Sequence, residues 1–204
     1  YICSKILQLK MSWGKFIATA GLFGAYIVKD TIPDEKIEIL RDNCNNLRDR
    51  AMIDFLLSTG IRVGELVRLN IDDIDFSERE CVVYGKGDKE RKAYFDAKTK
   101  IHLLNYIESR TDNNIALFVS LNKPHSRLTE SGVELRLREM GKKLGVEKVH
   151  PHKFRRTMAT RAIEKGMPIE QVQKILGHEQ IDTTLRYAMV NQNNVKLSHR
   201  KYIS

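Results

Sequence analysis

A histidine and an arginine three residues apart, His152 and Arg155, stand at the start of the segment HPHKFRRTMATRAIEKG. If this segment forms a helix, the two side chains lie on the same face. A proton acceptor beside a permanent cation suits a phosphodiester, because its reaction needs both charge neutralisation and proton transfer. Tyr187 follows later in the chain, and its phenol oxygen is a candidate nucleophile towards phosphorus.

Each candidate also has an ordinary structural interpretation. His152 follows a proline and suits a helix-start hydrogen bond, while His178 follows a glycine and suits a cap. Tyr187 suits a half-buried aromatic position, which is the commoner role of a single tyrosine. Arg62 suits a surface ion pair with Glu65. Taken one at a time, these residues do not decide between structure and chemistry.

The order of the candidates is more specific than any one of them. It resembles the pattern of the tyrosine recombinases, also called phage-type integrases, and most closely that of their Xer-like and transposon-integrase members. In that family a first arginine is followed by a lysine in a hairpin, H-x-x-R, a later histidine that is often part of L-G-H, and a tyrosine. The matching positions, within a resemblance that runs from about Pro33 to about Tyr202, are Arg62, Lys86, His152, Arg155, His178 and Tyr187.

The resemblance implies that three of these side chains bind the phosphate of a DNA strand. Arg62 and Arg155 would grip the non-bridging oxygens, because a guanidinium offers forked donors and neutralises charge as it develops. His178 would donate a third hydrogen bond. Around them, the resemblance implies an orienting role for Glu65 and DNA contacts from Lys89, Arg91 and Arg156.

The other three residues would supply the nucleophile and move the protons. His152 is the best candidate to accept the Tyr187 proton, because a phenol with a pKa of about 10 is a poor nucleophile near neutral pH. The loop that carries Lys86 reads by itself as an ordinary solvated turn, but the resemblance implies that Lys86 protonates the 5′ oxygen as it leaves. The products would be a 3′-phosphotyrosyl bond and a free 5′ hydroxyl. The ester preserves the bond energy for rejoining, so the implied reaction requires no ATP, metal or cofactor.

Composition agrees with a nucleic-acid partner. The formal net charge of +9 and the pI near 9.5 make a polyanion the first partner to consider, and binding through phosphates would weaken as salt rises. No apolar run reaches the roughly 18 to 20 residues of a membrane span, and the start of the chain lacks the layout of a signal peptide. The three cysteines, Cys3, Cys44 and Cys81, lack C-x-x-C spacing and predict reduced thiols in a cytoplasmic protein rather than a zinc site or disulfide framework.

The elements that must position the site are predicted to form an α+β fold, mostly helical with a small antiparallel sheet. Residues 1–32 are predicted to be helical and to form a connector or the remnant of an amino-terminal DNA-binding domain, or else an extra helix packed on the main domain. Residues 33–204 are predicted to be the catalytic domain. Apolar spacing and turn residues predict strands over Ile71–Phe76, Cys81–Tyr84, Arg91–Phe95 and Ala116–Ser120.

The helices are predicted from their apolar faces, caps and breakers. They begin after Pro33, at Leu47 (to Ser58), after Arg62, at Asp96 (to Arg110), at Thr129 (to Lys143), at His152, at Pro168 (to Leu176) and at Asp182 (to Val190). Gly60 and Gly177 are predicted to end helices. In the last helix, Asp182 or Thr183 is the predicted N-cap and Leu185 is predicted to face inward.

The implied function is site-specific recombination or integration of a mobile DNA element by a cytoplasmic, nucleoid-associated enzyme. The expected partners are double-stranded recombination sites, other protomers contacted through the carboxy-terminal tail in a tetrameric synaptic complex, and a directionality factor. No membrane partner is expected.

Two alternatives remain open at this point. A helix-turn-helix module without catalysis would use Pro168–Leu176, Gly177 and Asp182–Val190, but it leaves the first arginine, the hairpin lysine and H-x-x-R unexplained. A type IB topoisomerase would share the tyrosine chemistry. The discriminating observation is spatial, because either enzyme requires the residues Arg62, His152, Arg155 and His178 to converge on one face.

Overall fold

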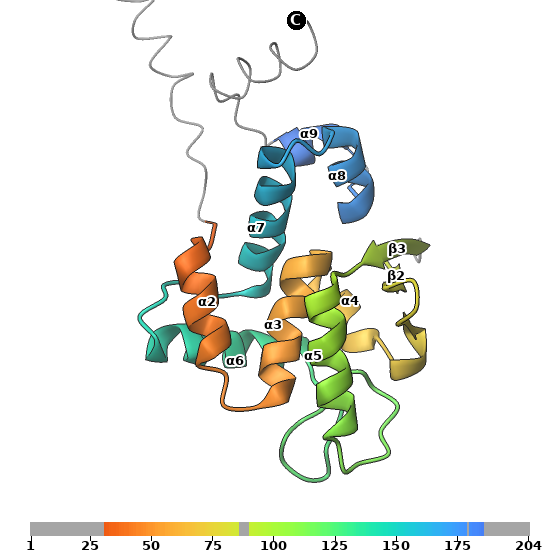
Figure 1. Ribbon diagram of the computed structural model, residues 1–204, viewed down its shortest axis with the longest axis vertical. Helices are drawn as coiled ribbons and strands as arrows, with labels where there is room; N and C mark the ends of the chain where they lie inside the picture. The colour runs from red at the N-terminus through yellow and green to blue at the C-terminus, as the bar shows by residue number, and fades with distance from the viewer. Residues whose placement is uncertain (1–30, 86–89, 179, 186–204) are drawn as a thin grey trace, which may run out of the picture.

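The computed structural model describes residues 31–85, 90–178 and 180–185. Within these ranges the fold is mostly helical with one small sheet, as predicted (Figure 1). The helices are α2 (Asp34–Asp42), α3 (Leu47–Thr59), α4 (Val63–Arg68), α5 (Ala97–Glu108), α6 (Glu130–Lys143), α7 (Pro151–Glu164), α8 (Ile169–Leu176) and α9 (Ile181–Leu185). The predicted helices from residue 34 to residue 176 are confirmed, with small differences at their ends. The predicted helix within residues 1–30 lies outside the described residues.

The sheet is antiparallel, in the order β1-β2-β3, with β1 at Ile74–Asp75, β2 at Glu80–Tyr84 and β3 at Glu90–Tyr94. The prediction of a first strand from Ile71 was too long, because residues 71–73 form a 3-10 turn. There the Asp73 carboxylate accepts a hydrogen bond from the Asn70 N–H at 2.7 Å, and such a local bond competes with strand pairing. The predicted strand over residues 116–120 is also wrong, since this buried stretch makes only two isolated bridges within the described chain.

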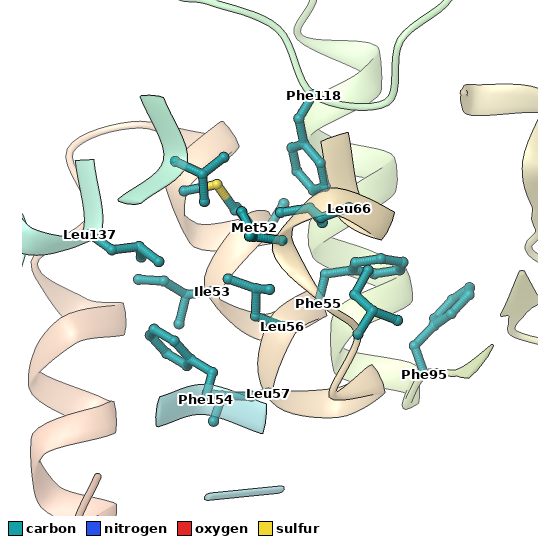
Figure 2. Packing of buried hydrophobic residues seen from close by; sticks show 14 of the residues in the cluster. Met52, Ile53, Phe55, Leu56, Leu57, Leu66, Phe95, Phe118, Leu137 and Phe154 are labelled. Atoms are coloured by element: carbon teal, nitrogen blue, oxygen red, sulfur yellow. The ribbon is translucent and has the colours of Figure 1, made fainter. Parts of the chain in front are cut away.

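The core is organised around α3, which is buried on nearly all sides. Met52, Ile53, Phe55 and Leu56 are each fully buried, and Figure 2 shows them meeting side chains from the surrounding elements. The buried carboxylates of α3 are ion-paired with arginines, so these charged positions also lie in the interior. In Figure 1, α3 lies between α2 and α5, and it also packs against α7. The helix that carries H-x-x-R is therefore fixed against the centre of the core.

The last described helix differs from its prediction in two respects. Because α9 begins at Ile181, neither Asp182 nor Thr183 is its N-cap. Leu185 was predicted to face inward, but it is 46% exposed, whereas Thr184 is fully buried. Adjacent helical residues point in different directions, so turning Thr184 inward turns Leu185 away.

The cysteine prediction is supported by the two thiols that the structure describes. Cys81 is buried, Cys44 is partly buried, and both are free. Burial raises the pKa of each thiol to about 12, so both are unreactive. Among the described helices, none combines the length and the apolar character needed to cross a bilayer.

Candidate active site

Arg62 stands at the N-cap of α4, immediately after the turn that ends α3. Gly60 makes that turn with a φ of 61°, a backbone conformation that glycine adopts easily. The Arg62 N–H donates to Glu65 Oε2 at 2.8 Å, and its guanidinium donates to Glu65 Oε1 at 2.9 Å. The ion pair proposed as an ordinary alternative therefore exists, and it holds an arginine side chain that is still 37% exposed.

Arg155 lies in the first half of α7 and is only 4% exposed. Its Nη1 donates to the carbonyl of Gly60 at 2.6 Å, and its Nη2 donates to the carbonyl of Leu176 at 2.5 Å. Both carbonyls belong to helix ends, where backbone acceptors have no partner within the helix. One guanidinium thus joins the end of α3 to the end of α8.

Three arginines share the end of α8. Arg91 donates to the carbonyl of Ile175 at 2.7 Å, Arg155 to that of Leu176 and Arg62 to that of Gly177 at 3.3 Å. We call Arg62, Arg91 and Arg155 the arginine collar. The negative end of the helix dipole favours cations at this position. The collar therefore concentrates basic charge around the turn that precedes His178.

His178 follows the collar and is half-buried. Its Nδ1 lies 2.9 Å from the hydroxyl oxygen of Thr184, the inward residue of α9. Burial, reinforced by the positive charges of Arg155, Arg62 and Arg91, lowers the pKa of His178 from 6.5 to about 4. The imidazole is therefore neutral at physiological pH.

His152 lines a pocket of about 270 Å³ beside Arg62 and Glu65. It is exposed, in contrast to Arg155 on the next turn of α7. Its ring also lies near that of His150, with centroids 6.5 Å apart. Residues at the base of the hairpin, Tyr84 and Gly85, line the same pocket together with Val63, Gly64, Arg68 and Glu130. The exposed side chains of His152 and Arg62 therefore line the same pocket.

The structure thus brings Arg62, Arg155 and His178 together at the end of α8, and Arg62 also lines one pocket with His152 and Glu65. Lys86, Lys89 and Tyr187 lie outside the described residues. The register of β2 and β3 pairs Tyr84 with Glu90, and Tyr84 is one of the residues that line the pocket. Arg156, the neighbour of Arg155 on α7, is half-buried.

Arg91, a predicted DNA contact, is mostly buried and binds groups within the protein. Its side chain is 11% exposed, and its Nη2 donates to Glu65 Oε2 at 2.7 Å. Burial lowers the pKa of Arg91 from its ordinary value, although the Glu65 carboxylate opposes the shift.

Several groups that position the site residues or line the pocket were not predicted from the sequence. The acceptors on α8 are backbone carbonyls, which no side-chain motif can reveal. Thr184 lies six residues after His178, and this spacing becomes informative only once the turn between α8 and α9 is known. The pocket residues Arg68 and Glu130 come from separate helices and carry no local signal.

Residues 31–194 match the model of the phage integrase family, so most of the chain is covered by one family. The chain belongs to the phage integrase family, a class of DNA breaking-rejoining enzymes. It is 37% identical over 173 residues to tyrosine recombinase XerC of Staphylococcus aureus, across 80% of this chain and 57% of the relative. The chain therefore spans little more than half the length of the curated relatives that it matches.

Solved structures agree with this assignment. The chain resembles the XerA recombinase with a TM-score of 0.73 and 32% identity, covering 84% of this chain and 64% of that one. The XerH site-specific recombinase in a pre-cleavage complex with its difH substrate gives a TM-score of 0.69 at 24% identity, covering 84% and 53%. The Tn1549 transposon integrase with transposon right-end DNA gives 0.73 at 20%, covering 87% and 67%. The last two show the shared fold, and the predicted fold and family are confirmed.

Proposed function

We propose that this chain is the catalytic part of a site-specific DNA recombinase that cleaves and rejoins strands through a 3′-phosphotyrosyl intermediate. The observation that carries the proposal is the arginine collar. It gathers Arg62, Arg155 and the turn before His178 from segments as far as 115 residues apart. Family membership supports the same chemistry.

The described geometry fits binding of a phosphodiester. Arg62 is exposed enough to meet a phosphate while Glu65 holds it in place. Arg155 adds a fixed positive charge behind it, and directed positive charge stabilises developing negative charge most when it is preorganised. His178, being neutral, can donate one hydrogen bond without adding a competing cation.

The remaining roles rest on the resemblance. His152, exposed in the pocket, is proposed to accept the proton of Tyr187 as its phenol attacks phosphorus. Lys86 is proposed to protonate the leaving 5′ oxygen. Lys89 and Arg156 are proposed DNA contacts. The bond from phosphorus to the 5′ oxygen breaks as the bond to the tyrosine oxygen forms, so no external energy source is needed.

We further propose that residues 33–204 form the catalytic domain and that residues 1–32 connect it to an amino-terminal DNA-binding domain. The proposed substrate is a double-stranded recombination site in a cytoplasmic, nucleoid-associated complex. Recombination would use four protomers joined through their carboxy-terminal tails, with a directionality factor where one is present. The likeness of this chain to the recombinases XerC and XerA supports only one of these points, that the substrate is a recombination site.

Covalent trapping tests the proposal. The full chain would be mixed with a pool of nicked duplexes tiled across the DNA that flanks its gene, and the products run on a denaturing gel. We expect a shifted protein–DNA band that disappears in Tyr187→Phe, because only the phenol oxygen can form the ester. Tyr202→Phe is the matched control and should keep the band. DNA binding without any band would favour the helix-turn-helix alternative.

A further inference from the structure

Arg91 connects the two halves of the site. It is the second residue of β3, next to the hairpin loop, and pairs with Val83 in the sheet register. One end of its guanidinium donates to Glu65 on α4, and the other donates to the carbonyl of Ile175 on α8, both at 2.7 Å. A single planar group therefore fixes the distance between α4, the hairpin and α8.

At the first end, Arg91 shares a buried carboxylate with Arg62. Glu65 is 3% exposed, and its Oε2 accepts hydrogen bonds from both the Arg62 backbone and the Arg91 guanidinium. A buried carboxylate that loses one cationic partner is costly, and it attracts the remaining cation more strongly. Without Arg91, Glu65 would hold the Arg62 guanidinium more tightly and compete with a phosphate for it.

At the second end, Arg91 packs against the residue before His178. A Cβ atom placed on Gly177 would lie 2.6 Å from Arg91 Cδ and 2.8 Å from Arg91 Nε. This approach is closer than van der Waals contact allows, so the arginine stem occupies the space that any other residue at position 177 would need. The position of His178 is therefore set partly by Arg91.

We propose that Arg91 is a positioning residue for strand cleavage and not a phosphate contact. It keeps Arg62 available to the phosphate by sharing the charge of Glu65, and it sets the place of His178 by holding the end of α8. This inference rests on the proposed recombinase function. A direct phosphate contact would require Arg91 to leave both of its buried acceptors.

The experiment compares three variants of the full chain, Arg91→Met, Arg91→Lys and Lys92→Met. The DNA is the nicked duplex that forms the covalent adduct with the wild type. Lys92 is the matched control, because it is the next residue, is 56% exposed and pairs with Glu80 at the surface. Two quantities are measured: the dependence of DNA affinity on salt, and the rate of covalent adduct formation at saturating DNA. Circular dichroism and thermal melting establish that each variant is folded.

We expect Arg91→Met to cleave about 100-fold more slowly at saturating DNA, since a small misplacement of catalytic groups has an effect of that order. In the double variant Arg91→Met with Glu65→Gln, where no carboxylate competes for Arg62, the salt slope should stay that of the wild type, whereas loss of a phosphate contact made by Arg91 itself would reduce the slope by about 0.9. Arg91→Lys should be intermediate, because an ammonium cannot reach both acceptors in the same plane. Lys92→Met should cleave at the wild-type rate.

The double variant Arg91→Met with Glu65→Gln separates positioning from general destabilisation. If Glu65 withholds Arg62 once Arg91 is gone, neutralising Glu65 makes the double variant cleave no more slowly than Arg91→Met. Additive losses, a reduced salt slope in the double variant, or an unchanged rate in Arg91→Met would each overturn the inference. Failure of the wild type to form any Tyr187-dependent adduct would instead overturn the proposed function, so the two failures are distinguishable.

Discussion

The apolar core around α3 and the end of α8 are held together by different kinds of contact. Around α3, fully buried apolar residues such as Phe55 and Leu56 pack without directional bonds (Figure 2). At the end of α8, buried guanidiniums bind backbone carbonyls, as Arg155 binds those of Gly60 and Leu176. The first arrangement derives its stability from the area removed from water, and the second derives its geometry from the direction of each hydrogen bond.

The two regions meet at Gly60. This residue ends α3, and its carbonyl accepts the Arg155 hydrogen bond at 2.6 Å. Packing of α3 in the core thus fixes the position of one acceptor of the collar. Damage to the core should reach the site through Gly60, whereas damage to the collar should leave the core folded.

The largest expected effect on stability comes from the core. Phe55→Ala should lower the free energy of unfolding by about 3–5 kcal/mol, because it leaves a cavity at a fully buried position. Urea denaturation measures the change. Val82→Ala, at a strand position 37% exposed, is the control and should stay within about 0.5 kcal/mol of the wild type. Equal losses in both variants would contradict the central place of α3.

Arg155→Met should reduce the rate of cleavage strongly and the stability only moderately, in contrast to Phe55→Ala. Covalent adduct formation should fall by about 100- to 1,000-fold, the range for loss of one preorganised group that stabilises developing charge. Stability should fall less than in Phe55→Ala, by about 1–3 kcal/mol for the two carbonyls left without their donor. Parallel kinetics and urea denaturation measure both. Cleavage at the wild-type rate by Arg155→Met would show that Arg155 has no role in the reaction.

The core around α3 was easier to predict from the sequence than the contacts at the end of α8. The helices around α3 were predicted because their apolar spacing, caps and the terminal Gly60 are local signals. The sequence motif also named Arg62, Arg155 and His178, which the structure brings to the end of α8, whereas the predicted roles of Lys86 and Tyr187 stay predictions. The partners of Arg91 and the inward turn of Thr184 were not predicted, because they depend on contacts between segments far apart in sequence. The 3-10 turn at residues 71–73 was missed because one Asp73–Asn70 hydrogen bond outweighed apolar alternation.

Gly177→Ala should have a smaller effect on stability and cleavage, and it tests the contact between Gly177 and Arg91. Gly145 is the matched control, because both glycines have a φ of 63° but only Gly177 has Arg91 against its missing Cβ. Gly145→Ala should cost about 1–2 kcal/mol for the left-handed backbone alone. Gly177→Ala should cost more and should also slow adduct formation. Thermal melting and cleavage assays compare the two.

An Arg91→Met background sharpens this comparison. The flexible methionine stem can move away from a new Cβ, so the extra cost of Gly177→Ala over Gly145→Ala should shrink there. Coupling between residues in contact is expected to be of the order of 0.5–3 kcal/mol. An unchanged difference would mean that backbone conformation alone requires glycine at position 177.

The smallest expected effect is the pH dependence that His178 contributes. Its folded pKa of about 4 lies below the ordinary value of 6.5, so between these values the unfolded chain binds a proton that the folded chain does not. Stability from this residue is therefore complete above about pH 6.5 and is lost as the pH falls towards 4. Because the ring is only half-buried, the loss should be about 1 kcal/mol rather than the full linkage value.

His178→Gln tests this contribution, since glutamine keeps a hydrogen-bonding side chain but does not titrate. Urea denaturation of both proteins at several pH values should give a smaller decline for the variant over the acidic window, and the two curves should run in parallel above it. Bound DNA should reduce the difference, because a phosphate near the imidazole favours its protonated form and offsets the effect of the three arginines. Identical pH dependence in wild type and variant would mean that the collar does not depress this histidine, and that His178 can reach the phosphate as a cation.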